Sequence, residues 1–126
     1  MTRPFYEFIS TALDASDQSE VEGHSAVICL AEPGHPVLFV SEEFEAHTGF
    51  TPAEAIGRNL SFLQGPETEP EAVELFRHLL RTGGAGTIRI TNYRKDKSPF
   101  LHECDLRPVK DASGNVTHFI AIQRPI

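Results

Sequence analysis

Three polar side chains stand among apolar ones in the C-terminal third of the chain, and they have the chemistry to hold a ligand. Asn92, His102 and Gln123 each fall on the apolar face of an alternating segment. A buried amide without a partner costs roughly 1–3 kcal/mol. The set therefore indicates a structural hydrogen-bond network, a strand register shifted by one residue, or a polar ligand. Amides that donate and accept suit a flat heterocycle with amide-like edges.

The two cysteines, Cys29 and Cys104, are the other reactive groups of the chain. They are too few and too far apart for a disulfide framework or a zinc site, and the six histidines do not cluster at ligand spacing. The sequence contains no nucleophile elbow, no P-loop and no glycine fingerprint for dinucleotides. We therefore expect neither a metal centre nor an enzyme.

The elements that must position these residues begin with an N-terminal helix, for which Pro4 suits the first turn. Its apolar stripe consists of Phe5, Phe8, Ile9, Ala12 and Leu13. The polar, acidic stretch 14–23 is typical of a linker. We thus expect a helix and linker over residues 1–22 and one compact domain over 23–126. The stripe needs a partner, either the domain's own sheet or a second copy of the chain.

The compact part shows strand signals at both ends and helix signals between them. A hairpin is predicted over 25–31 and 37–40, around a turn at 32–36. Three alternating strands close the chain, at 88–93, 100–109 and 116–123.

Between the strands, Ser41 can cap a first short helix that ends near Gly49. A capping box at 51–54 begins a second, a turn follows at 59–63, and a similar signal at 68–71 begins a third. This order predicts an α+β fold, a five-stranded antiparallel sheet with short helices on one face plus the N-terminal helix.

Charge and hydropathy exclude two classes of partner. The net charge is −7 and no basic stripe occurs, which argues against direct nucleic-acid binding. The longest apolar run, at 26–31, is too short to cross a membrane, and the N-terminus lacks the layout of a signal peptide. A cytoplasmic location is the resulting expectation.

Several motifs resemble the light-oxygen-voltage (LOV) subfamily of PAS domains. Residues 57–66 read G-R-N-L-S-F-L-Q-G-P and are similar to the family's G-R-N-C-R-F-L-Q-G-P. Residues 92–96 match its N-Y-R-K-D segment, 48–50 resemble its T-G-Y, and 108–109 and 119–123 resemble its last two strands. Because these motifs occur in the family's order from about residue 25 to residue 123, the resemblance is specific and implies a PAS fold that holds a flavin, usually FMN.

The resemblance also implies roles for individual residues. Asn92 and Gln123 would bind the pyrimidine edge of the flavin, and Arg77 would meet its phosphate. The other implied contacts are Asn59 and Gln64 on the polar side of the flavin, Val73, Leu106 and Phe119 against the ring system or chain, and Cys104 on the ligand-facing side of its strand.

Three positions depart from the family pattern. Leu60 stands where the family's photoreactive cysteine would be, and leucine cannot bond the flavin ring. Ser61 replaces an arginine that contacts the phosphate, so FMN would bind less tightly and riboflavin or FAD becomes possible. His102 stands where the family has a second asparagine on the pyrimidine edge, and imidazole can also titrate.

Three modes of action remain open. Light could reduce the flavin without a covalent bond, and the new charge would then act on His102 and Gln123. A relocated cysteine, Cys29 or Cys104, could take the part of the missing one. A light-insensitive PAS module for ligand binding or protein interaction would also tolerate Leu60.

Output is expected to pass through association, since the chain ends at Ile126, soon after the last predicted strand. A short stand-alone sensor would end there, and so would a truncated longer protein. The N-terminal helix and the outer sheet face with Ile120 and Ile122 then predict a homodimer interface.

Overall fold

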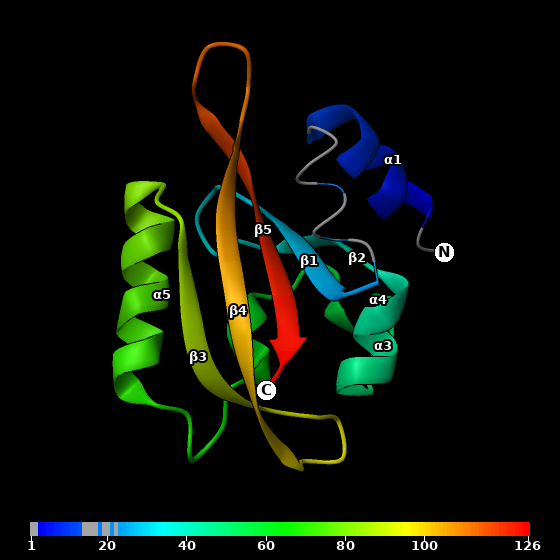
Figure 1. Cartoon of the computed structure of the whole chain (residues 1–126), viewed down its shortest axis with the longest axis vertical. Coiled ribbons are helices and arrows are strands. Elements are labelled where there is room, and N and C mark those ends of the chain that lie inside the picture. The colour runs from blue at the N-terminus through cyan, green and yellow to red at the C-terminus, as the bar shows by residue number, and fades with distance from the viewer. Residues whose placement is uncertain (1–2, 14–17, 19–20, 22) are drawn as a thin grey trace.

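The structure of the chain is a computed structural model, shown in Figure 1, that describes residues 3–13, 18, 21 and 23–126. The predicted linker over 14–23 lies largely outside the described residues, so the division at residue 22 stays a prediction. Within the described part, no helix is long and apolar enough to cross a membrane.

A five-stranded antiparallel sheet forms the centre of the molecule and confirms the predicted fold class. Its strand order is β2-β1-β5-β4-β3. The strands are β1 (Ser25–Leu30), β2 (Val37–Val40), β3 (Gly86–Tyr93), β4 (Pro99–Lys110) and β5 (Val116–Pro125). The strand β5 therefore lies in the middle of the sheet, between the N-terminal hairpin and the C-terminal strands, as Figure 1 shows.

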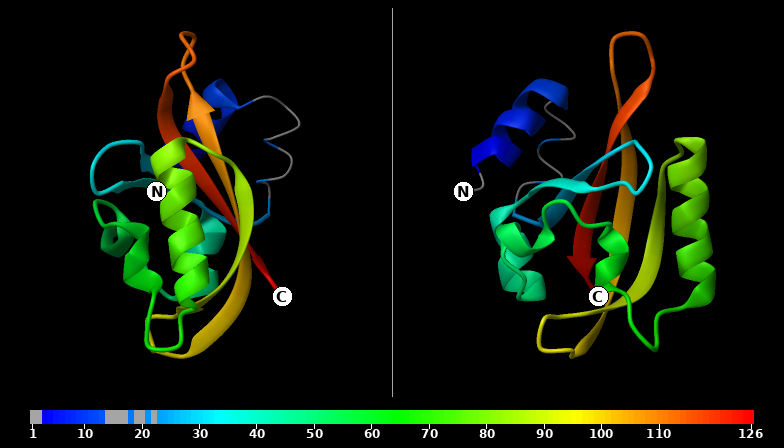
Figure 2. Two further views of the ribbon diagram at one scale, coloured as in Figure 1. Left: turned by 90° about the vertical axis from the view of Figure 1, so that its left-hand side faces the viewer. Right: turned by 180° about the vertical axis from the view of Figure 1, so that it is seen from behind.

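Helices cover both faces of this sheet. The helices are α1 (Arg3–Ala12), α3 (Glu42–Thr48), α4 (Pro52–Ala55), the 3-10 helix η1 (Leu60–Leu63) and α5 (Pro70–Thr82). Figure 2 shows α1 on one side of the sheet and the others on the opposite side. We call the side under α3, α4, η1 and α5 the inner face and the side under α1 the outer face.

The predicted capping signals are right at one helix and partly wrong at two. At α4, Thr51 and Glu54 form the complete capping box that the sequence predicts. At α3, the Ser41 hydroxyl bonds to β1 instead, accepting from Ala26 N at 2.9 Å.

At α5 the N-cap is Glu69 and not Thr68. The Thr68 hydroxyl donates to Thr91 O at 2.7 Å, and the Glu69 carboxylate accepts from Thr91 N and Oγ1, each at 2.7 Å. These two side chains connect the start of α5 to β3, because tertiary hydrogen bonds to the strand take the place of a local cap.

Strand alternation places the core as predicted. Phe119 and Ala121 face inward, into a cluster with Ile88, Ile90 and Leu106 under α5. A second inner cluster lies under α3, α4 and η1, and it contains Val27, Val37, Val40, Phe44, Ala55 and Leu63.

On the outer face, a third cluster unites the sheet with α1, since Ile120 and Ile122 are buried together with Ile9. The Phe8 ring lies 5.8 Å from the Phe39 ring and 4.6 Å from the His118 ring, centroid to centroid. Of the two partners left open for the helix, the structure therefore shows the sheet of its own chain.

Candidate ligand site

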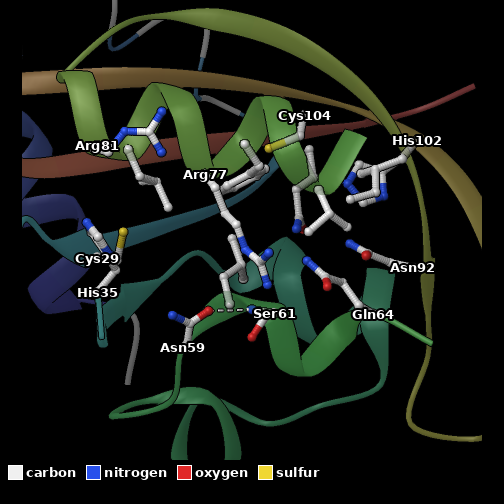
Figure 3. A pocket seen from close by; sticks show the side chains of 16 residues that line it. Cys29, His35, Asn59, Ser61, Gln64, Arg77, Arg81, Asn92, His102 and Cys104 are labelled. Carbon is white, nitrogen blue, oxygen red and sulfur yellow. Dashed lines mark hydrogen bonds between the residues drawn. The ribbon is translucent and has the colours of Figure 1, made fainter. Parts of the chain in front are cut away.

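A cavity of about 350 Å³ lies between the inner face of the sheet and the helices η1 and α5. Figure 3 shows it from close by, with strand residues on one side and η1 on the other. Its lining consists of Cys29, His35, Asn59, Leu60, Ser61, Gln64, Val73, Phe76, Arg77, Leu80, Arg81, Ile90, Asn92, His102, Cys104 and Gln123. A cavity of this size with a mainly apolar wall and a few polar groups is typical of small-molecule sites.

The three polar residues singled out from the sequence meet at one end of the cavity, which we call the polar end (Asn92, His102 and Gln123). All three are buried, with His102 fully enclosed. Asn92 Oδ1, His102 Nδ1 and His102 Nε2 have no hydrogen-bond partner among the residues that the structure describes. Because buried polar atoms are rarely left unpaired, this end of the cavity has capacity for a polar ligand.

Gln123 differs from the other two because one of its polar atoms is already engaged. Ser25, its register partner on β1, donates its hydroxyl to Gln123 Oε1 at 2.7 Å. This bond orients the amide and leaves the NH₂ group of Gln123 as a donor for the cavity.

Aromatic rings and a second histidine surround His102. Its ring stacks on Phe100 at 5.2 Å between centroids, and the His47 ring on α3 lies 5.8 Å away. Burial, and secondarily the charge of His47, lowers the pKa of His102 to about 4. Burial, with Arg94 as a further cause, also lowers the pKa of His47. Near neutral pH the His102 ring is therefore uncharged, and one of its nitrogens donates while the other accepts.

The two cysteines line the cavity from strands on either side of β5. Cys29 pairs with Phe119, and Cys104 pairs with Gln123, so both thiols face inward. Burial raises the pKa of Cys29 to about 11 and that of Cys104, with the nearby Asp105 as a further cause, to about 12. Both groups are neutral thiols, which are weaker nucleophiles than thiolates.

The opposite end of the cavity is open and carries the exposed residues Asn59, Ser61, Arg77 and Arg81, which we call the mouth. Asn59 is held by its own chain, since its Oδ1 accepts from Ser61 N and its Nδ2 donates to Gly34 O, both at 2.8 Å. Arg77 pairs with Glu74 at 3.3 Å, and Arg81 lies one helical turn further along α5. The mouth therefore has a positively charged side.

Most ligand contacts implied by the resemblance line this cavity. The two exceptions, Leu106 and Phe119, are buried in the same cluster as Ile90 and Cys104 but do not line the cavity themselves.

Five lining residues were not anticipated as contacts, namely His35, Phe76, Leu80, Arg81 and Ile90. Periodicity could have indicated four of them. On the helix, Phe76 and Leu80 follow Val73 by three and seven residues, and Arg81 follows Arg77 by four. On a strand, Ile90 precedes Asn92 by two. His35 has no such signal, because it reaches the cavity from the turn between β1 and β2.

The described residues contain no group of three or more His, Cys, Asp or Glu that could hold a metal ion. The site instead combines uncharged polar atoms in the interior, apolar walls and cations at the surface.

The chain that forms this cavity is similar to several known proteins. A family model described as PAS domain matches residues 24–126. Phototropin-1A of Oryza sativa subsp. japonica is 37% identical over 117 residues, which cover 93% of this chain and 12% of that protein. The Blue-light photoreceptor of Listeria innocua serovar 6a is 32% identical over 126 residues, which cover 98% of this chain and 46% of that protein. The chain thus spans less than half the length of these relatives.

Among solved structures, one described as "Flavin Analogue Sheds Light on Light-Oxygen-Voltage Domain Mechanism" superposes with a TM-score of 0.84 at 34% sequence identity. The match covers 94% of this chain and 87% of that one. The similarity in space therefore extends over nearly the whole chain.

Proposed function

This chain belongs to the PAS domain family, in its LOV subfamily, and on that premise we propose that it is a flavin-binding sensory domain. Its input would be blue light or redox state, sensed without a cysteine at the family's usual position. The observation that carries the proposal is the polar end of the cavity, where Asn92 and His102 present buried polar atoms without protein partners. Such atoms are costly unless a ligand binds them.

The cavity suits a flavin, and FMN in particular, in three respects. The amides of Asn92 and Gln123, with the neutral ring of His102, offer the mixed donors and acceptors that a pyrimidine edge requires. Apolar side chains such as Val73 and Leu60 line the walls, where a flat ring system would lie. Arg77 at the mouth would meet the phosphate.

A bound flavin would supply absorption of blue light and the capacity to accept an electron. The protein's part is to hold the ring, exclude water from it and respond at its polar end. A negative charge gained there would raise the pKa of His102 and would attract the NH₂ group of Gln123. Because Ser25 holds Gln123 Oε1, a rotation of that amide would break a bond between β1 and β5.

Both routes to a photoproduct have support in the site. Cys29 and Cys104 both line the cavity, so the proposal includes a bond from either sulfur to the flavin. Flavin photoreduction would need an electron donor. Tyr93 is a poor candidate because its hydroxyl accepts from Glu67 N, outside the cavity lining. The donor would then be a cysteine or an external reductant.

The deciding experiment is the absorption spectrum of the purified protein in darkness and under blue light, with and without a reductant. We expect an absorption band of bound flavin in the blue, with the fine structure of a ring held in an apolar cavity. Reversible bleaching that Cys29→Ala or Cys104→Ala abolishes would assign the sulfur. Bleaching that survives both substitutions and requires reductant would assign photoreduction. A protein that stays colourless with added flavin refutes the proposal.

A second candidate function is a light-insensitive PAS module that binds a ligand or a protein. The observation that favours it is Leu60, which lines the cavity where the family has its cysteine. Bound flavin whose spectrum is unchanged by light and reductant would assign this function instead.

We further propose that output passes through homodimerisation in the cytoplasm. Both cysteines are free, which fits a reducing compartment. Three residues of the α1 stripe, Phe8, Ile9 and Leu13, already pack on the sheet of their own chain, so a dimer would need α1 to move or would use other surface. Molar mass measured by light scattering in darkness and under illumination tests this, and a monomer in both states rules it out.

The chain matches only part of its longer relatives, so the effector activities of those proteins are not part of this proposal. The Blue-light-activated histidine kinase of Brucella anthropi, for example, is 38% identical over 91 residues that cover 18% of it. For this stretch we propose a sensory role and no enzymatic activity.

A further inference from the structure

Arg81 occupies a position in the mouth that the LOV resemblance assigns to no function. It lies on α5 four residues after Arg77, and at 3.6 residues per turn the two side chains share one face of the helix. Both line the cavity. In Figure 3 they extend from the same helix, on the side of the cavity opposite η1.

The Arg81 guanidinium is not neutralised by a carboxylate. It lies instead 3.3 Å from His78 Nδ1. Among the ion pairs of the described residues, Arg77 has Glu74, while none involves Arg81. A guanidinium at a cavity mouth with donors to spare is suited to an anionic group of a ligand.

The rest of the mouth offers an anion little else. Ser61 has a short neutral side chain, and Asn59 has its oxygen and its nitrogen bonded within the chain. The arginines that line the cavity both come from α5, where Arg77 shares its charge with Glu74, while His35 lines it from the turn between β1 and β2.

We propose that Arg81 is a phosphate-binding residue, and that with Arg77 it makes this chain select a phosphorylated flavin over riboflavin. The inference rests on the proposed function, since it presumes that a flavin occupies the cavity. It replaces the expectation that Ser61 weakens phosphate binding. The lost arginine on η1 is compensated from the other side of the mouth, by a second arginine on α5.

Arg81 could also have a purely structural role, and the test must distinguish that role from phosphate binding. It lies in the last turn of α5, where a cation stabilises a helix through its dipole. Such a role would affect every flavin alike, whereas a phosphate contact acts on FMN and leaves riboflavin untouched. Comparing the two flavins therefore isolates the contact.

The experiment is a thermodynamic cycle on the full chain, with dissociation constants from flavin fluorescence titrations of ligand-free protein. FMN and riboflavin are each titrated into the unsubstituted protein, Arg81→Ala and Arg81→Lys. The matched control is Arg89→Ala, which removes an exposed arginine of β3 that pairs with Glu103 of β4, away from the cavity lining. It makes the same change in net charge.

We expect Arg81→Ala to weaken FMN about tenfold, or about 1.4 kcal/mol, while riboflavin affinity stays within about twofold. Arg81→Lys should keep part of the FMN affinity, because lysine keeps the charge but loses the guanidinium fork. Arg89→Ala should change neither flavin. In Arg77→Ala/Arg81→Ala, FMN and riboflavin should bind with nearly equal affinity.

Three results would overturn the inference while leaving the proposed function intact: equal losses for FMN and riboflavin in Arg81→Ala, no loss for either, or the same FMN loss in Arg89→Ala. If the unsubstituted protein binds neither flavin, the proposed function fails and the inference fails with it. A preference for riboflavin in the unsubstituted protein would also overturn the inference alone.

Discussion

The two faces of the sheet use the same strands in opposite ways. On the outer face, Ile28, Ile120 and Ile122 are at most 2% exposed and belong to one apolar cluster with Ile9 of α1, although Ile120 and Ile122 also line a smaller cavity. On the inner face, Asn92 and His102 are equally buried, yet they border a cavity of about 350 Å³ and keep polar atoms without protein partners. The outer face is covered by a helix of the same chain, and the inner face leaves a cavity whose polar atoms have capacity for a ligand.

This difference shows that burial alone does not distinguish a core from a site. Side chains on both faces are removed from water, and only hydrogen-bond satisfaction and packing separate them. A substitution on the outer face should therefore act on stability, and one on the inner face should act mainly on ligand binding.

The largest expected effect comes from a matched pair of isoleucines, Ile28 in the packed cluster of the outer face and Ile90 on the cavity wall. Ile28→Ala should lower the free energy of unfolding by about 2–5 kcal/mol, because it opens a void among fully buried side chains. Flavin affinity should not change. Ile90→Ala should cost less stability in the ligand-free protein, because its side chain already borders a void, but it should weaken flavin binding.

Urea denaturation and flavin titration of both variants test this contrast. Similar losses of stability together with unchanged flavin affinity in both variants would show that the two faces do not differ in the way described.

The next effect is a dependence of stability on pH that comes from His102. Its pKa is about 4 in the folded protein and about 6.5 in the unfolded chain. As pH falls from about 6.5 to about 4, the unfolded chain binds a proton that the folded one does not, so stability is lost in that window. The loss should reach about 3 kcal/mol, since one pKa unit corresponds to 1.36 kcal/mol.

The window above pH 4.5 isolates histidines, because the lowered carboxyl pKa values of Glu54, Glu69 and Asp96 act below it. His47 and His118, whose pKa values are also lowered by burial, contribute in the same direction. Melting temperature against pH for the ligand-free protein and for His102→Asn measures the difference. Parallel curves for the two proteins would exclude His102 as the source.

The smallest expected effect concerns Ser25, which joins the two sheet regions at the polar end. Ser25→Ala removes the bond to Gln123 Oε1 and should lower stability by about 1 kcal/mol. It also frees the amide to rotate, so the absorption band of the bound flavin should shift in wavelength. The neighbouring Ser41→Ala, which removes a buried hydroxyl bonded to His24 and Ala26, is the control. Equal spectral shifts in both variants would contradict a specific role for Ser25.

Much of the fold was predictable because local patterns and tertiary demands agree in it. Alternation fixes which residues of β3, β4 and β5 face inward, since a shift by one residue would expose every apolar side chain of a strand. The capping box at Thr51 was predictable because its partners are three residues apart. The wrong assignment of Thr68 shows the limit, since its hydroxyl bonds to Thr91, a residue of β3 that no local pattern connects to it.

The sequence by itself determined the order of elements, the inward placement of Asn92, His102 and Gln123, and the resemblance that relates them to a flavin. Only the tertiary structure decided that α1 lies on its own sheet, that Gln123 is held by Ser25, and that Arg81 shares the mouth with Arg77. The physical reason is that periodicity reports which face a side chain occupies. Its partner is set by how distant segments approach, and that depends on the packing of the whole chain.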